Sequence, residues 1–177
     1  SRWLAQSVPL GVGQFGTGAW VAVGIDLDDF AGVLAARLGE VPAGTMLYPG
    51  IGERYAAGIG VLDRTDGVEL LTGSSHAGTP VCAVTTASVF DDHGELAAEV
   101  FGPSTLVVSC RDAAEMLQIA NRLGGQLTAT VHGDVDDPGD FELARASYRE
   151  AIDLCTNEVE RAHLHARLAE IPAGRPQ

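Results

Sequence analysis

Three glycines near the start of this sequence have a spacing that could bind a nucleotide. Gly11, Gly13 and Gly16 follow the G-x-G-x-x-G pattern, in which a bare backbone approaches a pyrophosphate at the N-terminus of a helix. That chemistry requires a buried strand before the glycines and a helix after them. Here a proline interrupts residues 6–10, and a strand-like Trp-Val-Ala-Val run follows at residues 20–23. The pattern therefore predicts a glycine-rich turn.

The other residues with nucleophilic or metal-binding chemistry do not form a recognisable constellation. Three cysteines, Cys82, Cys110 and Cys155, are too few and odd in number for a disulfide framework, which favours a reducing cytoplasm. The segment Ser74-Ser75-His76 is a polar loop without the acid and the sharp turn that a serine nucleophile needs. We predict no catalytic role for it.

Two further groups of polar residues could hold a metal ion. His163 and His165 lie two residues apart on an expected helix and so point in different directions. Four acids at residues 134–140 lack the glutamate at position 12 that closes a calcium loop. The sequence therefore predicts no metal site, and an acidic linker at residues 134–140.

Composition excludes several classes of protein. The 177 residues include 24 Asp and Glu but only 11 basic residues, all Arg, which gives a net charge of −13. Such an acidic chain is repelled by phosphate backbones, so we expect no nucleic-acid binding. No apolar run reaches the roughly 18 residues that span a bilayer, and no signal peptide opens the chain. We expect a cytoplasmic protein with no membrane contact.

Hydrophobic periodicity predicts an α/β domain over residues 1–133, with parallel strands and flanking helices. Short turns join the strand at 105–109 to a helix and then to the strand at 126–132, which predicts a right-handed parallel crossover. Asp112 caps this helix, with Glu115 three positions later. The expected strands are residues 20–23, 68–72, 80–86, 105–109 and 126–132, and the expected helices begin near Asp26, Ile51 and Asp112. The first of these helices has Phe30, Val33, Leu34 and Leu38 at helical spacing and ends at Gly39. The second has Tyr55, Ile59 and Leu62 on one side, and we expect this stripe to belong to the core. In the third we expect Met116, Leu117, Ala120 and Leu123 to face the core.

Composition changes after the α/β region. Residues 134–140 form an acidic Pro/Gly linker, and residues 141–177 contain two helical stretches, which predicts a C-terminal helical hairpin. One helix pair cannot bury its own apolar face, so we expect it to pack on another surface.

Several segments resemble the aldehyde dehydrogenase superfamily. Glu99-Val100-Phe101-Gly102-Pro103 matches the family pattern E-x-F-G-P, and it is followed in family order by a strand, a helix and Gly125-Gln126-Leu127-Thr128-Ala129-Thr130. Residues 10–15 (LGVGQF) and 42–47 (PAGTML) are more closely similar to the 2-oxoglutarate-semialdehyde dehydrogenases. The resemblance covers about residues 1–133.

The resemblance implies an oxidoreductase that converts an aldehyde, such as 2-oxoglutarate semialdehyde, into the acid with NAD or NADP. In the family a cysteine thiolate attacks the aldehyde, and water activated by a glutamate later hydrolyses the thioester. The match carries over two residues: Glu99 would hydrogen-bond the nicotinamide ribose, and Phe101 would pack beside the nicotinamide. They are the expected cofactor-binding residues.

The nucleophile position departs from the family pattern. Relatives read G-Q-F-C-T-N-P-G where this chain has Gly13-Gln14-Phe15-Gly16-Thr17-Gly18, so Gly16 stands where the family has its cysteine. The family's base, oxyanion and nucleotide-binding segments would precede Ser1. Because the chain begins at Ser1 rather than Met, we expect a fragment, a processed product or a trimmed chain. We expect it to be inactive alone, because Gly16 replaces the nucleophile and the nucleotide-binding domain is absent. Its expected partners are a nucleotide-binding domain or further copies of itself.

The tail resembles the helical C-terminal extension of some extracytoplasmic-function sigma factors. Residues 148–154 (YREAIDL) and 157–170 carry this resemblance. It suggests an alternative to the pseudoenzyme hypothesis, in which the chain is a non-catalytic interaction module or a relic fusion product with a partner-binding tail.

Overall fold

The computed structural model describes residues 2–14 and 18–123, and isolated positions of the tail at residues 149, 152, 161, 165, 166, 168 and 169. The chain divides into two units, Ser1–Leu127 and Thr128–Gln177. The predicted strand at 126–132, the linker at 134–140, both stretches of the helical hairpin and Cys155 lie largely or wholly outside the described residues. The helices and strands with defined bounds all belong to the first unit.

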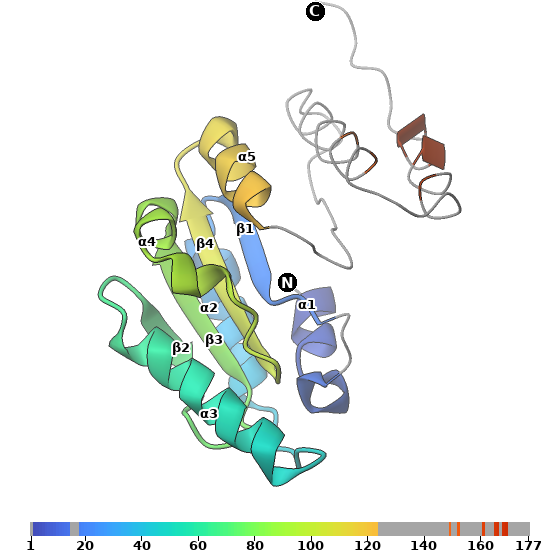
Figure 1. Ribbon diagram of the computed structural model, residues 1–177, viewed down its shortest axis with the longest axis vertical. Coiled ribbons are helices and arrows are strands. Elements are labelled where there is room, and N and C mark those ends of the chain that lie inside the picture. Colours follow the sequence, from blue (N-terminus) through green and yellow to red (C-terminus); the bar gives the residue numbers. More distant parts are fainter. Residues whose placement is uncertain are drawn as a thin grey trace, which may run out of the picture. The chain divides into compact units, whose positions relative to one another are not determined.

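A four-stranded sheet in the order β1-β4-β3-β2 forms the centre of this unit (Figure 1). Its strands are β1 (Val21–Ile25), β2 (Glu69–Thr72), β3 (Val81–Thr86) and β4 (Ser104–Cys110). β4 pairs in parallel with β1 and β3, whereas β2 runs antiparallel to β3 along one side. The predicted α/β class with parallel strands is confirmed, and four of the five predicted strands fall in the described sheet.

Helices cover both faces of the sheet. The helical elements are α1 (Arg2–Ser7), η1 (Leu10–Gly13), α2 (Asp28–Gly39), α3 (Pro49–Arg64), α4 (Ala87–Asp92), η2 (Gly94–Ala97) and α5 (Ala113–Arg122). α1 and α2 bury one face of the sheet, around Leu34, Leu38 and Val107. α3, α4 and α5 bury the other face, around Tyr55, Ile59 and Phe90. The two helix layers lie on opposite sides of the strands (Figure 1).

The buried faces agree with the predicted helical stripes, apart from Val33 and Ala120. Leu34, Leu38, Ile59 and Leu62 are at most 2% exposed. Val33, which was expected to face the core, is 45% exposed, because it lies on the opposite side of α2 from the buried Ala31 and Ala35. Ala120 of α5, also expected to face the core, is exposed, and Ile119 is the buried residue of that helix. None of the helices in the described part of the chain is both long and apolar enough to cross a membrane.

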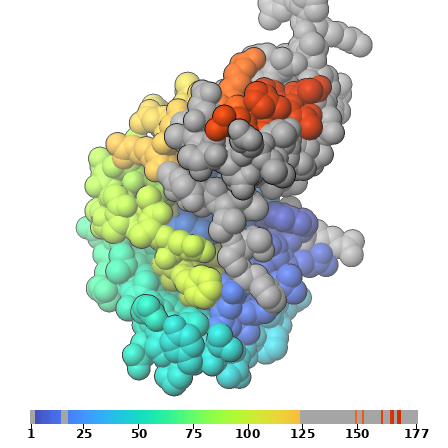
Figure 2. Space-filling model, turned by 45° about the vertical axis from the view of Figure 1, so that its right-hand side comes forward, coloured from blue at the N-terminus to red at the C-terminus, as the bar shows by residue number. Residues whose placement is uncertain are grey.

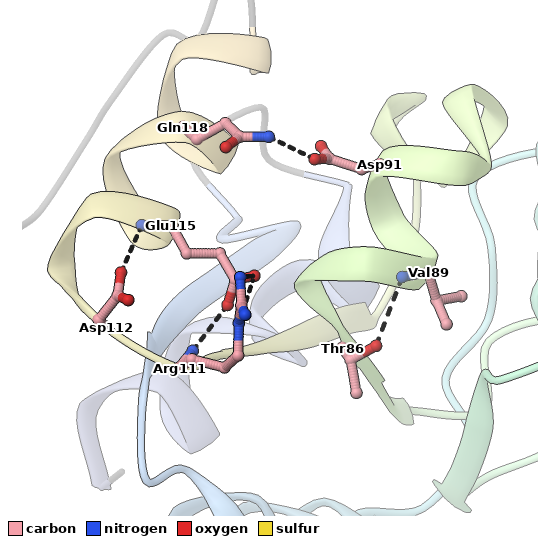
Figure 3. A network of polar contacts seen from close by, with 7 residues as sticks. All are labelled: Thr86, Val89, Asp91, Arg111, Asp112, Glu115 and Gln118. Atoms are coloured by element: carbon pink, nitrogen blue, oxygen red, sulfur yellow. Dashed lines mark hydrogen bonds and ion pairs between the residues drawn. The ribbon is translucent and has the colours of Figure 1, made fainter.

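The start of α5 is stabilised as the sequence predicted, with a local difference. Asp112 Oδ1 accepts a hydrogen bond from the Glu115 amide at 2.9 Å, as an N-cap does. The Glu115 carboxylate bonds the amide of Arg111 at 2.7 Å rather than that of Asp112, the usual capping-box partner. The Arg111 guanidinium explains the difference, because its Nη2 lies 2.8 Å from Glu115 Oε1 (Figure 3). This ion pair keeps the carboxylate beside Arg111, one residue before the usual partner Asp112.

Polar contacts also join α5 to α4. Gln118 Nε2 donates to Asp91 Oδ2 (Figure 3). Arg122 Nη1 donates to the Asp91 carbonyl at 2.8 Å. Arg122 Nη1 also lies 3.1 Å from Asp91 Oδ1. We regard this second contact as an ion pair, because the carbonyl takes the directed hydrogen bond. At the start of α4, Thr86 Oγ1 accepts from the Val89 amide at 3.4 Å.

Removing the N-cap of α5 should destabilise the domain. We expect Asp112→Ala to lower the free energy of unfolding by about 1 kcal/mol, because the Glu115 amide loses its acceptor. Asp112→Asn keeps an acceptor oxygen and should lose only a few tenths of that amount. Urea unfolding of the three proteins measures both differences, and equal losses in the two variants would contradict an N-cap role.

Candidate functional site

Three segments that carry the family resemblance, at residues 10–14, 42–47 and 99–103, meet at one end of the sheet. β1, β4 and β3 are mutually parallel, so the loops that precede them lie at the same edge. Four segments converge there, at residues 10–14, 42–48, 76–79 and 99–103, and we call them the loop junction. In the space-filling view, yellow-green residues near position 100 lie between teal α3 and blue N-terminal elements (Figure 2).

Two pairs of glycines let the backbones of the loop junction touch. Gly13 has φ +63°, and a Cβ on it would lie 2.2 Å from the carbonyl carbon and oxygen of Gly102. A Cβ on Gly78, which has φ +78°, would lie 1.9 Å from the carbonyl oxygen of Gly44. Real atoms cannot approach so closely, and a positive φ adds strain for any residue with a side chain. Glycine is therefore required at positions 13 and 78 for two reasons, the positive φ and the close contact with the opposing backbone.

Hydrogen bonds hold the same segments together. Gln14 Oε1 accepts from the Leu47 amide at 2.8 Å, and the Gly44 amide donates to the Gly78 carbonyl at 2.9 Å. The turn at η1 has a positive φ at Gly11, Val12 and Gly13, and it follows helix α1 rather than a strand. The glycine-rich turn is confirmed, since a dinucleotide fingerprint would need a strand before it.

The two predicted cofactor residues lie on the exposed side of the loop junction. Glu99 is exposed, and the Phe101 ring is 40% exposed. Phe101 lines a cavity of about 220 Å³ together with Tyr48, Ile51 and Arg54. An exposed carboxylate can accept hydrogen bonds from hydroxyl groups, and an exposed aromatic ring offers an apolar face to a planar group.

Arg54 fixes one wall of this cavity. Its Nε donates to the Gly50 carbonyl at 3.1 Å, and its Nη2 donates to the Tyr48 hydroxyl at 3.1 Å. Sequence reasoning did not select Tyr48 or Arg54. The only signal that pointed to them was their place at the start of α3, close to the PAGTML segment.

Gly16, the expected nucleophile position, lies outside the described residues. Gln14, two residues earlier, belongs to the loop junction, and the chain is described again from Gly18. In the described residues, no group of three or more His, Cys, Asp or Glu could hold a metal ion.

Two cysteine thiols lie inside the sheet rather than at the loop junction. Cys82 on β3 is fully buried, and Cys110 ends β4, at the opposite edge from the loop junction. Burial raises the pKa of the Cys82 thiol from its ordinary value of 9.0 to about 11. Burial, together with the carboxylates of Glu115, Asp112 and Asp91, raises the pKa of Cys110 to about 11. Neither thiol is a ready nucleophile at neutral pH, because the thiolate is the reactive form.

The polar loop at residues 74–76 contains a serine and a histidine in contact. Ser74 Oγ lies 2.9 Å from His76 Nδ1, and it also accepts from the His76 amide at 3.4 Å. Contacts between residues two apart are typical of a side chain that closes its own turn.

Comparisons with known proteins place these features in a family. No family model matches the chain. It is 39% identical over 140 residues to the alpha-ketoglutaric semialdehyde dehydrogenase 2 of Azospirillum brasilense, a match that covers 74% of this chain and 26% of that protein. It is 29% identical over 155 residues to the alpha-ketoglutaric semialdehyde dehydrogenase of Acinetobacter baylyi, a match that covers 82% of this chain and 30% of the relative.

Solved structures with the same fold are also aldehyde dehydrogenases. An NAD-dependent benzaldehyde dehydrogenase from Corynebacterium glutamicum has a TM-score of 0.56 at 16% identity, over 70% of this chain and 29% of its own. A salicylaldehyde dehydrogenase from Pseudomonas putida G7 has a TM-score of 0.59 at 18% identity, over 81% of this chain and 32% of its own.

The chain belongs to the aldehyde dehydrogenase superfamily. It spans between about a quarter and a third of the length of these four relatives. The predicted family is therefore confirmed for a part of an aldehyde dehydrogenase subunit.

The contact between Gly13 and Gly102 should tolerate no side chain. We expect Gly13→Ala to lower the free energy of unfolding by at least about 2 kcal/mol, from left-handed backbone strain and the overlap with Gly102. Gly32→Ala is the matched control, because a Cβ there meets nothing within 4 Å and lies on helix α2. That variant should gain roughly 0.5–1 kcal/mol. Urea unfolding that ranks the two variants in the reverse order would contradict the close approach.

The buried thiols should make stability fall at alkaline pH. The pKa of Cys82 is higher in the folded state, so its contribution is complete below pH 9 and is lost as the pH rises toward 11. A shift of this size corresponds to on the order of 2 kcal/mol. In reducing buffer, Cys82→Ala should be less stable than the parent at pH 8, and the difference should shrink at pH 10.5. A constant difference would argue against a buried, neutral thiol.

Proposed function

We propose that this chain derives from the catalytic domain of an aldehyde dehydrogenase whose substrate is a short aldehyde bearing a carboxylate, such as 2-oxoglutarate semialdehyde, and that the chain is inactive alone. The observation that carries the proposal is the 39% identity over 140 residues to an alpha-ketoglutaric semialdehyde dehydrogenase. The loop junction supports it, because two segments that resemble the family, residues 10–15 and 99–103, touch at Gly13 and Gly102.

Glu99 and Phe101 are the residues that would hold NAD or NADP. The Glu99 carboxylate would accept hydrogen bonds from the ribose, and the Phe101 ring would pack against the nicotinamide beside Tyr48. The cofactor would supply the hydride acceptor for oxidation of the aldehyde. These residues form only one side of a binding site, so we expect the chain alone to bind NAD(P) weakly.

In this proposal Gly16 occupies the position where the relatives have a nucleophilic cysteine. Glycine has no side chain, so no thioester can form there. Cys82 and Cys110 do not replace it, because both are buried in the sheet and have raised pKa values. We infer that the chain does not oxidise aldehydes by the covalent route of its relatives.

Gly16 also favours a second candidate function, that of a non-catalytic interaction module. In this alternative residues 141–177 recruit a partner, and the α/β unit serves as a scaffold. Binding of that kind would persist in a Gly16→Ala variant and would be lost on deletion of residues 134–177. The two functions therefore respond to different changes in the chain.

A nucleophile restored at position 16 should restore the chemistry. We expect Gly16→Cys, mixed with the nucleotide-binding domain of the Azospirillum relative as a separate chain, to oxidise 2-oxoglutarate semialdehyde with NAD or NADP. The unchanged protein and Gly16→Ala in the same mixture should be slower by several orders of magnitude, because loss of a covalent nucleophile has effects of that size. Absorbance at about 340 nm follows the reduced nicotinamide that hydride transfer forms.

The controls decide between the outcomes. Circular dichroism and co-elution establish that each variant is folded and in complex with the supplied domain. Turnover by the unchanged protein or by Gly16→Ala would show that another group is the nucleophile. A complexed but inactive Gly16→Cys variant would contradict the proposed relation between Gly16 and the family's cysteine.

A further inference from the structure

A buried tyrosine connects helix α3 to two segments of the loop junction. Tyr55 is 0% exposed, and its hydroxyl donates to the Thr79 carbonyl at 2.5 Å. The same hydroxyl lies 3.4 Å from the Pro103 carbonyl, which is a longer and weaker second contact. Thr79 precedes β3 and Pro103 precedes β4, and the Val81 amide donates to the Pro103 carbonyl at 2.9 Å. The hydroxyl therefore links the residues that immediately precede two neighbouring parallel strands, β3 and β4.

The ring of Tyr55 makes a second contact, with the backbone of Gly102. Gly102 has φ +154°, and a Cβ on it would lie 2.2 Å from Tyr55 Cδ2. The carbonyl group of Gly102 is also the group that a Cβ on Gly13 would meet at 2.2 Å. Gly102 therefore has no room for a side chain, because of the Tyr55 ring, and its carbonyl group leaves no room for a side chain on Gly13.

Burial constrains Glu99 and Phe101 less than it constrains Tyr55. Phe101 is 40% exposed, and Glu99 is exposed. Their positions therefore also depend on the backbone that carries them, and that backbone is held at Gly102 and Pro103. Tyr55 is the buried side chain that contacts both of these residues.

We propose that Tyr55 is a positioning residue, which holds the 99–103 segment so that Glu99 and Phe101 present one side of a nicotinamide nucleotide site. This role rests on the proposed function of Glu99 and Phe101. Burial also raises the pKa of the Tyr55 phenol well above its ordinary value of 10.0, so the hydroxyl remains a donor throughout the neutral range. The same burial excludes Tyr55 from direct contact with a cofactor.

Tyr55→Phe isolates the hydroxyl, because phenylalanine keeps the ring against Gly102. The matched control is Thr65→Val, which removes another hydroxyl from the end of α3, where Thr65 Oγ1 donates to the Val61 carbonyl at 2.8 Å. Both variants remove a side-chain hydroxyl that donates to a carbonyl, but only the Tyr55 hydroxyl contacts the loop junction. Circular dichroism and urea unfolding establish that both are folded.

The first measurement uses the chain itself and does not depend on activity. Amide hydrogen exchange should be at least about fivefold faster for Val81 and Ser104 in Tyr55→Phe, because their acceptors are the Pro103 and Gly102 carbonyls. Exchange at the centre of β4, at Leu106 and Val107, should change no more than global stability requires. Thr65→Val should leave the exchange rates of all four amides as they are in the parent protein. Unchanged exchange at Val81 and Ser104 would overturn the positioning role.

The second measurement tests the link to the cofactor. In the Gly16→Cys mixture with the supplied nucleotide-binding domain, Tyr55→Phe should raise the dissociation constant for NAD(P) by about fivefold, and Thr65→Val should not. Faster exchange with unchanged NAD(P) affinity would overturn the claim that Tyr55 positions the cofactor residues. If no variant binds NAD(P), including the one with Tyr55 intact, the proposed function fails, while the exchange data still decide whether Tyr55 holds the segment.

Discussion

The contact between the backbones of Gly13 and Gly102 is the constraint on which the loop junction depends. The two residues are 89 positions apart in the sequence, and a Cβ on Gly13 would lie 2.2 Å from the carbonyl group of Gly102. Once they touch, the segment that leads to residue 16 and the segment that carries Glu99 and Phe101 share one surface. The parallel pairing of β4 with β1 and β3 makes the contact achievable, because it brings the strand entrances to the same edge.

The same sheet explains why its cysteines are unsuited to attack an aldehyde. A thiol on a central strand is shielded by helices on both faces, and the loss of hydration favours its neutral form. Cys82 and Cys110 both show this effect. A reactive thiolate would need a partly exposed backbone position, such as a glycine-rich turn at the strand entrances offers. The proposed inactivity follows, because neither buried thiol can replace the cysteine that relatives have at the position of Gly16.

The fold could be predicted largely from local sequence patterns. β-branched runs marked β3 and β4, and helical spacing selected the buried residues Leu34, Leu38, Ile59 and Leu62. Helix α1 was missed, because six residues are too few to show a periodicity. The position of the Glu115 carboxylate was missed because it depends on the Arg111 guanidinium, a partner outside the capping-box pattern.

The candidate site was less predictable, because its contacts are long-range. Glu99 and Phe101 came from a family resemblance, and no local pattern would have selected them. Tyr55 was correctly expected to be buried, but a helical stripe does not reveal that its hydroxyl reaches carbonyls 24 and 48 residues away. The close approaches of Gly13 and Gly78 were equally hidden, since a glycine in a turn can always be explained by local conformation.

The contacts of Gly102 with Gly13 and Tyr55 limit which residues an inactive descendant of the family could change. A descendant that had stopped oxidising aldehydes would still need to fold, and a side chain at Gly13 or Gly102 would meet backbone or the Tyr55 ring within 2.2 Å. Selection for a folded chain would by itself preserve these glycines long after selection for turnover had ended. In such a descendant G-x-G-Q and F-G-P would remain because of packing, and only residues free to change without unfolding the protein would record when activity was lost.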